Sequence, residues 1–303
     1  MSANIFHRAL IGIMPFMPRS LIWRFSRRYI AGVTLQDACN TAADMNAAGC
    51  SATIDVLGED STADDQVEAA VALYIQAIRD ISAASIDCGV SVKLSEMGLR
   101  FDSARCREAT LVLLAAAREH GLFVRIDMED SSVTEITLEL YRELRKQFDN
   151  VGIVIQSCLR RSKDDIAELM REGPTDVRLC KGIYVEPEDI AYTDSDEIRG
   201  SFDELLEQLF SGGARRVGIA THDPLLVANA EKLVERMAID HDRYEFQMLL
   251  GVAGSLRREL VSRSHPLRVY VPFGELWYNY SIRRLRENPH IAGHIVKNLF
   301  SRS

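Results

Sequence analysis

Eight short apolar runs, each followed by a stretch with helical periodicity, constrain the fold of this chain more than any other feature. The runs are short and rich in Val and Ile, which predicts buried strands rather than helices. Alternating strands and helices predict a parallel sheet, and eight such units predict a closed α/β barrel of the (βα)8 TIM type. The runs cover residues 52–57, 90–94, 123–128, 151–156, 177–181, 217–221, 244–249 and 267–273.

The segments between the runs have apolar residues spaced three and four apart, as amphipathic helices on the outside of a barrel require. They include residues 64–84, 106–120, 133–148, 203–212 and 225–238. Gly49, Gly89 and Gly121 stand just before the first three runs, and Gly152 stands at the start of the fourth. We expect each of these glycines to adopt a positive φ at a helix end or tight turn.

Length and composition favour one large domain. Residues 51–287 span close to the roughly 250 residues typical of such barrels, so we expect an amino-terminal helical arm over 1–50 and a barrel over 51–303. The chain is 47% hydrophobic and 26% charged, which suits a soluble protein with a sizeable core. Six cysteines without a C-x-x-C pair indicate reduced thiols and a cytoplasmic location.

The first 36 residues contain five arginines and no acidic residue, whereas the rest of the chain has a net charge of −13. We interpret this arm as one or two helices packed on the barrel. Contact with an anionic membrane surface is the main alternative. A cleaved targeting peptide is a further one, which the smooth helical pattern of residues 34–48 disfavours. The acidic balance argues against nucleic-acid binding. The packing residues would be Ile5, Leu10, Leu21, Trp23 and Tyr29.

Charged residues stand where two of the predicted strands end. Alternation along a strand sends Lys93 to the face opposite Val92 and Leu94, and Asp127 to the face opposite Ile126. Both side chains therefore point into the same barrel mouth. The chain has only six lysines, and two of them, Lys93 and Lys181, fall at strand ends. A lysine and a carboxylate there are candidates for binding or catalysis.

Three other interpretations of these strand ends stay open. A buried lysine–aspartate pair can simply fill the barrel. Lys93 could instead form a Schiff base, as in barrel aldolases. Asp127, Glu129 and His222 could hold a divalent metal for hydrolysis, although no second His or Cys lies at ligand spacing around His222. A non-catalytic binding barrel is a minor alternative.

The sixth run ends in Thr221-His222-Asp223-Pro224, which predicts a helix capped by Asp223 with proline in its first turn. The N-terminus of this helix would lie beside the mouth. Free backbone N–H groups and positive potential at such an end suit a phosphate or pyrophosphate. Thr221 and His222 are therefore candidates for binding one.

The end of the barrel carries aromatic and basic residues at helical spacing. Trp277, Tyr280, Arg283 and Arg284 recur three and four residues apart and share one side of a helix. Two adjacent guanidinium groups with a tyrosine one turn earlier suit a small apolar body that bears a carboxylate. Solvated surface charge is the alternative.

Several ordered motifs together resemble the proline dehydrogenase family over almost the whole chain. They are SVKLS (91–95), IDMED (126–130), VIQ (154–156), VRLCKGIY (177–184), ATHD (220–223), FQM (246–248) and residues 270–288. The chain shows no added aldehyde dehydrogenase or DNA-binding module, so it resembles the monofunctional bacterial type. Cys180, Ile183, Val185 and Asn279 depart from common family residues and bear on substrate preference.

The resemblance implies a distorted (βα)8 barrel with non-covalent FAD and with the last helix over the mouth. It implies oxidation of L-proline to Δ1-pyrroline-5-carboxylate, the first step of proline catabolism to glutamate. Electrons would pass to a quinone, with peripheral contact at the inner face of the membrane. A separate pyrroline-5-carboxylate dehydrogenase would act next. Hydroxyproline is the alternative substrate.

The resemblance also implies roles for individual residues. Lys93, Arg283 and Arg284 would hold the substrate carboxylate, and Tyr270 and Tyr280 would wall its ring. Asp127 would orient the cations, and Arg178 would stabilise charge on the reduced flavin. Residues implied to bind FAD are Met128, Gln156, Lys181, Gly182, Ile183, Thr221, His222 and Gln247.

Overall fold

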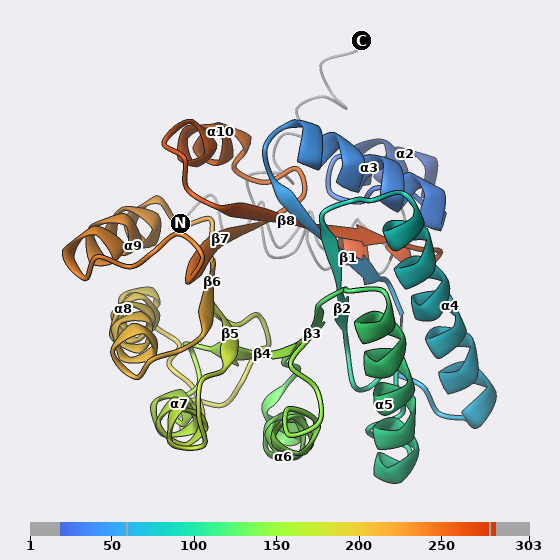
Figure 1. The fold of residues 1–303 in the computed structure, drawn as a ribbon, viewed down its shortest axis with the longest axis horizontal. Coiled ribbons are helices and arrows are strands. Elements are labelled where there is room, and N and C mark those ends of the chain that lie inside the picture. Colours follow the sequence, from blue (N-terminus) through green and yellow to red (C-terminus); the bar gives the residue numbers. More distant parts are fainter. Residues whose placement is uncertain (1–18, 59, 279, 283–303) are drawn as a thin grey trace.

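The computed structural model describes residues 19–282 apart from residues 59 and 279. Its eight strands form a closed, all-parallel barrel in sequence order (Figure 1), as predicted. Three of the predicted runs match their strands at both ends, and the other five differ by one or two residues at each end. The strands are β1 (Ser51–Val56), β2 (Cys88–Val92), β3 (Val124–Ile126), β4 (Val151–Gln156), β5 (Asp176–Cys180), β6 (Arg216–Ala220), β7 (Tyr244–Leu249) and β8 (Leu267–Phe273).

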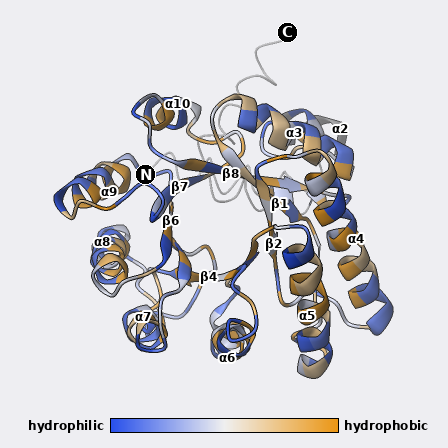
Figure 2. Ribbon diagram, viewed as in Figure 1, coloured by the Kyte–Doolittle hydropathy of each residue, from blue (hydrophilic) through white to orange (hydrophobic). Residues whose placement is uncertain are grey.

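One α-helix follows each of the first seven strands and lies on the outside of the barrel (Figure 1). Hydrophobic and hydrophilic residues alternate along these helices (Figure 2), as the amphipathic pattern predicted. The helices are α4 (Asp64–Ala83), α5 (Ser103–Glu119), α6 (Thr134–Leu144), α7 (Ser162–Arg171), α8 (Ser195–Ser211), α9 (Pro224–Arg236) and α10 (Gly254–Ser262).

Helix α3 (Leu35–Ala47) precedes the barrel and covers the seam between β8 and β1. In a regular (βα)8 barrel the helix after β8 takes this place. A capping box begins α3, since Thr34 and Asp37 each accept a hydrogen bond from the other's backbone N–H. The chain after β8 is therefore not needed to close the outer ring.

The described part of the amino-terminal arm packs on the barrel. Helix α2 (Arg19–Ser26) buries Ile22, and the ring of Trp23 lies 4.7 Å from that of Trp277. The backbone N–H of Ala31 donates to the carbonyl of Pro272 in β8 at 2.9 Å. This agrees with the interpretation of the arm as an accessory of the barrel. Residues 1–18, with Ile5 and Leu10, lie outside the described residues.

Outward-facing strand residues form the core with the helices, while inward positions are polar or small. Gly49 and Gly121 have the predicted positive φ, at 79° and 69°. The same prediction is wrong for Gly89 and Gly152, which lie inside β2 and β4. The reason at position 152 is space inside the barrel, because a Cβ there would lie 2.3 Å from Nη1 of Arg125.

Candidate active site

Lys93 follows β2 and points into the barrel, as its place in the alternation predicted. Its ammonium group donates to Oδ1 of Asp55 at 2.7 Å and lies 3.5 Å from Oδ2 of Asp127. Burial alone would lower the pKa of Lys93, but the two carboxylates outweigh it and raise that pKa well above its usual value. Lys93 therefore stays protonated, which disfavours the Schiff-base interpretation because that chemistry needs a neutral amine.

Asp127, directly after β3, is the shared acceptor of the cluster. Its Oδ1 accepts from Ser91 Oγ at 2.6 Å and from Arg178 Nη1 at 2.9 Å, and its Oδ2 accepts from Tyr270 Oη at 2.8 Å. Burial tends to raise the pKa of Asp127, but Lys93, Arg178 and these hydrogen bonds hold it below the ordinary value. Asp127 is thus an ionised carboxylate that fixes the positions of several neighbours.

Arg178 projects inward from β5 and is 7% exposed. Its Nε donates to Oε1 of Gln247 at 2.5 Å, and its guanidinium carbon lies 5.3 Å from the ring centroid of Tyr270. The amide of Gln247 also donates to Glu245 at 2.6 Å. Both ends of the Gln247 amide are therefore engaged inside the barrel, where they hold Arg178. The predicted contact of Gln247 with a cofactor stays a prediction.

Asp55 belongs to this site but was not among the predicted residues. It lies in β1, is 1% exposed and accepts from Lys93. Burial raises its pKa, and Lys93 opposes that shift. The signal was present in the sequence, because Thr53 and Asp55 alternate with Ala52 and Ile54 just as Lys93 alternates with Val92.

We name Asp55, Lys93, Asp127 and Arg178 the mouth cluster. Its two cations and two carboxylates balance, so an added anion meets no net negative charge in this set. The metal interpretation gains no support from the contacts. Glu129 accepts from Ser95 and His222 Nε2 accepts from the backbone N–H of Leu249, while Asp127 is held by cations.

Helix α9 begins at the mouth as the sequence predicted. The side chain of Asp223 caps it by accepting from the backbone N–H of Leu225 at 3.1 Å, and Pro224 opens the helix. Asp223 also accepts from Lys181 at 2.6 Å and from Arg199 at 2.7 Å. Burial tends to raise its pKa, but these hydrogen bonds lower it to about 2. The capping carboxylate is therefore matched by two cations.

The predicted phosphate-binding residues come together at this helix end. Thr221 accepts from the backbone N–H of Asp223 at 3.1 Å, and Lys181 reaches the same Asp223 from the end of β5. His222 is fixed by the Leu249 N–H at 2.8 Å. A helix N-terminus with a lysine and a hydroxyl group beside it has the donor set that a pyrophosphate requires.

The segment after β5 adds a surface suited to a flat ring system. Gly182 has a φ of 97° and packs so tightly that a Cβ would lie 2.3 Å from Sγ of Cys158 and 2.8 Å from Oε1 of Gln156. Ile183 follows with 40% of its surface exposed, while Met128 is buried. An exposed apolar side chain next to the pyrophosphate donors fits a dinucleotide such as FAD.

Tyr280 is buried against Ile30 and Leu57, with Trp277 packed beside them. Residues 277, 278 and 280–282 are helical, so the helix after β8 begins next to the end of β1. This places its first turn at the mouth side of the barrel. Arg283 and Arg284, and the rest of this predicted helix, lie outside the described residues.

Comparison with known proteins agrees with this geometry. A family model described as proline dehydrogenase matches residues 38–296. The chain belongs to the proline dehydrogenase family. It is 34% identical to proline dehydrogenase 1 of Bacillus subtilis (strain 168) over 91% of each chain, and 32% identical to proline dehydrogenase of Deinococcus radiodurans over 93% of this chain and 92% of that one. As a member of this family the chain is an oxidoreductase.

A solved structure shares the fold. Proline utilization A from Bdellovibrio bacteriovorus, inactivated by N-propargylglycine, superposes with a TM-score of 0.84 at 22% identity. The match covers 95% of this chain and 37% of that longer one. The chain thus has the barrel of that protein and the length of the monofunctional members of the proline dehydrogenase family.

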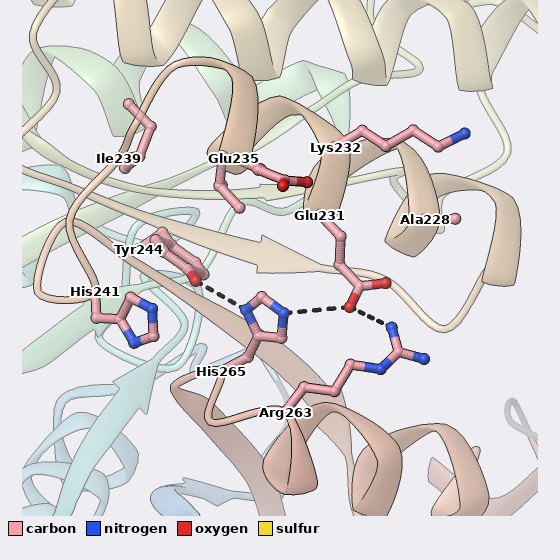
Figure 3. Close-up of a pocket in the computed structure, with 10 residues that line it drawn as sticks. Ala228, Glu231, Lys232, Glu235, Ile239, His241, Tyr244, Arg263 and His265 are labelled. Atoms are coloured by element: carbon pink, nitrogen blue, oxygen red, sulfur yellow. Dashed lines mark hydrogen bonds and ion pairs between the residues drawn. The ribbon is translucent and has the colours of Figure 1, made fainter.

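A separate cavity of about 520 Å³ lies at the opposite end of the barrel from this site (Figure 3). Its residues come from α9, from the segment before β7 with Tyr244 at the start of that strand, and from the segment before β8. His265 lies between Tyr244 Oη at 2.8 Å and Glu231 at 3.2 Å, and Arg263 bonds the same Glu231 at 2.6 Å. These groups bind one another at the amino ends of the strands, away from the mouth that the family motifs line.

Proposed function

We propose that the chain oxidises L-proline to Δ1-pyrroline-5-carboxylate with non-covalently bound FAD. The mouth cluster is the observation that carries this proposal. Lys93 and Arg178 are charged and held by Asp127, the first half-buried and the second buried, and the N-terminus of α9 offers donors for a pyrophosphate. Family membership supplies the reaction, and the cluster supplies groups for an amino acid's carboxylate.

In this proposal Lys93 binds the substrate carboxylate together with Arg283 and Arg284. Lys93 keeps its charge because Asp55 and Asp127 raise its pKa. Tyr270, held through its hydroxyl group by Asp127, and Tyr280 form walls for the five-membered ring. Fixing the carboxylate at one end of a small ring orients its other end, and such positioning provides much of the rate.

The same proposal assigns the other residues to FAD. Lys181, Thr221, His222 and the α9 N-terminus would hold the pyrophosphate, and Gly182 lets backbone come close. When bound, FAD would accept the hydride from the ring carbon next to nitrogen. Arg178 would stabilise the negative charge of the reduced ring, and Asp127 keeps Arg178 in place. Further contacts would come from Met128, Gln156, Ile183 and Gln247.

Hydride loss requires a neutral substrate amine. The rate should therefore rise with pH until that amine is deprotonated in the complex. A flat rate between neutral and alkaline pH would contradict the proposed chemistry.

The direct test is spectroscopic. Purified protein should be yellow, and anaerobic addition of L-proline should bleach it, with hydroxyproline as the comparison substrate. The Arg236→Met variant, which changes only an exposed ion pair, serves as the control and should bleach as the unchanged protein does. Colourless protein that binds no added FAD, or yellow protein that proline leaves unbleached, would disprove the function.

We infer that the reduced enzyme passes its electrons to a membrane quinone and that a separate dehydrogenase consumes the product. Within the described residues, no helix is both long and apolar enough to span a bilayer. The basic arm supports contact at the surface of an anionic membrane instead. Deletion of residues 1–33 should then weaken liposome binding and quinone turnover. Unchanged binding and turnover would remove the arm from this step.

A further inference from the structure

Glu96 is a buried carboxyl group next to the mouth cluster that the proposed reaction does not use. It lies shortly after β2 and is 3% exposed. Its Oε1 accepts from the backbone N–H of Gly58 at 3.0 Å, and its own carbonyl accepts from Ser61 Oγ at 2.7 Å. Gly58 and Ser61 belong to residues 57–63, the loop between β1 and α4. Glu96 therefore holds this loop against the barrel.

The contact between Glu96 and the loop is close. A Cβ on Gly58 would lie 2.5 Å from Oε1 of Glu96 and 2.6 Å from its Cδ, so only glycine allows the backbone to approach this far. The loop follows Asp55 in β1 and continues from Leu57, which packs on Tyr280. The position of Glu96 is thus linked to two parts of the proposed substrate site.

The hydrogen bonds of Tyr74 indicate the protonation state of Glu96. The hydroxyl oxygen of Tyr74 lies 2.9 Å from the carbonyl of Ser91 and 3.3 Å from Oε2 of Glu96. A carbonyl only accepts, and a phenol has one proton. If that proton goes to the nearer carbonyl, the contact with Glu96 is satisfied only when Glu96 itself carries a proton and donates it to Tyr74.

The surroundings of Glu96 together favour the same state. Burial, with Asp55 of β1 and Glu129 after β3, raises the pKa of Glu96 to about 8, while Lys93, just after β2, and the hydrogen bond with Tyr74 oppose this shift. Tyr74 of α4 faces it too, and burial raises the pKa of that phenol well above its usual value. At neutral pH the neighbours of Glu96 thus include one cation and two carboxyl groups.

We propose that Glu96 is a positioning residue that stays a neutral carboxylic acid while it binds the β1–α4 loop, which leaves the charge of Lys93 to the substrate carboxylate. This inference rests on the proposed function. The mouth cluster has two cations and two carboxylates, and an ionised Glu96 would add a net negative charge beside Lys93. An anionic ligand should then bind less well once Glu96 loses its proton.

The test measures binding of cyclopentanecarboxylate to the FAD-loaded enzyme by calorimetry. This probe has the ring and carboxylate of the substrate but no amine, so its own charge stays constant from about pH 6.5 to 9.5. The Kd of wild-type enzyme should rise on the order of tenfold as pH passes from below to above the pKa of Glu96, the change that one pKa unit of coupling produces. Glu96→Gln keeps a donor and an acceptor in place but does not titrate, so its Kd should not show this rise.

Two further variants make the test sharper. Glu129→Gln, at the neighbouring buried carboxyl group, should keep the rise in Kd and serves as the matched control. Tyr74→Phe should move the midpoint of the rise to lower pH, because it removes the acceptor of the Glu96 proton. If Tyr74 instead donates to an ionised Glu96, the midpoint would move to higher pH, which would overturn the proposal.

Infrared spectra give an independent readout. The carbonyl band of a buried carboxylic acid should be present at neutral pH, fade as pH rises and be missing from Glu96→Gln. A rise in Kd that persists in Glu96→Gln, or a constant Kd in wild-type enzyme, would overturn the inference while proline-dependent bleaching still upheld the proposed function. Failure of bleaching would reject the function by itself.

Discussion

The barrel interior contains two charged clusters with different surroundings. The mouth cluster lies at the carboxyl ends of the strands, where the side chains of Lys93 and Asp127 are 21% and 14% exposed. A second set, here named the floor cluster, lies nearer the amino ends, where the side chains of Arg125 and Glu245 are only 6% and 5% exposed. The floor cluster consists of Arg125, Asp176, Arg216, Glu245 and Arg268.

In the floor cluster the charged side chains bind one another and backbone carbonyl groups of the barrel. Arg125 pairs with the carboxylate of Asp176 and also donates to the carbonyls of Ile153 at 3.0 Å and Asp176 at 2.9 Å. The carboxylate of Glu245 forms ion pairs with Arg216 at 2.8 Å and with Arg268 at 2.7 Å. These contacts join β3, β4 and β5 in one set and β6, β7 and β8 in another. Such ion pairs hold neighbouring strands together.

One barrel therefore contains ion pairs that hold strands together and ion pairs that are available to a ligand. Both clusters are inward-facing and combine cationic side chains with carboxylates, so residue type and alternation alone do not distinguish them. The difference is depth along the strands, because the mouth cluster lies at the carboxyl ends, where the active sites of such barrels are found, and the floor cluster lies nearer the amino ends. Gln247 links the two, since it accepts from Arg178 above and donates to Glu245 below.

The largest expected effect comes from breaking the floor cluster. Arg125→Met leaves Asp176 buried without its cation, which costs about 3–5 kcal/mol in the free energy of unfolding. Denaturant titration followed by circular dichroism measures the loss. Arg236→Met, at the exposed pair with Glu207, should cost no more than about 1 kcal/mol. Equal losses of unfolding free energy in the two variants would show that the floor cluster stabilises the barrel no more than an exposed ion pair does.

Breaking the mouth cluster should weaken substrate binding. Lys93→Met removes a charged hydrogen bond to the substrate carboxylate, worth about 1.5–3 kcal/mol, so the KM for proline should rise on the order of 10- to 100-fold. Steady-state kinetics and FAD content per protein give the result. Retained FAD with a raised KM supports the assignment, whereas an unchanged KM would place Lys93 with the structural pairs.

The smallest expected effect concerns the space that the floor cluster needs. Gly152→Ala would bring a Cβ within 2.8 Å of the carbonyl of Asp176, as well as against Arg125, and should destabilise the barrel by about 1–3 kcal/mol. Gly200→Ala in α8 has no heavy atom within 4 Å of the new methyl group and should stabilise by about 0.5–1 kcal/mol. Thermal unfolding of the two variants measures both changes in stability. If Gly152→Ala left the stability unchanged, the floor cluster would have to be able to shift and make room for the methyl group.

Much of the candidate site followed from local patterns. Alternation placed Lys93 and Asp127 at one mouth, and the order Thr221-His222-Asp223-Pro224 gave the capped helix beside it. The same alternation places Asp55 on the inward face of β1. It could not show that Arg125 and Arg178, both inward, belong to different clusters, because their depths depend on the stagger between strands.

The eight strands and helices, their parallel order and the polar residues at the strand ends could be predicted from the chain's local patterns. These properties depend on periodicities of two and three to four residues, which are local. Four features could be read only from the folded barrel: which charges meet, that α3 covers the β8–β1 seam, that Gly152 leaves room for Arg125 and that Glu96 holds the β1–α4 loop. Each of these depends on closing the barrel, which brings residues far apart in the chain into contact and removes them from water.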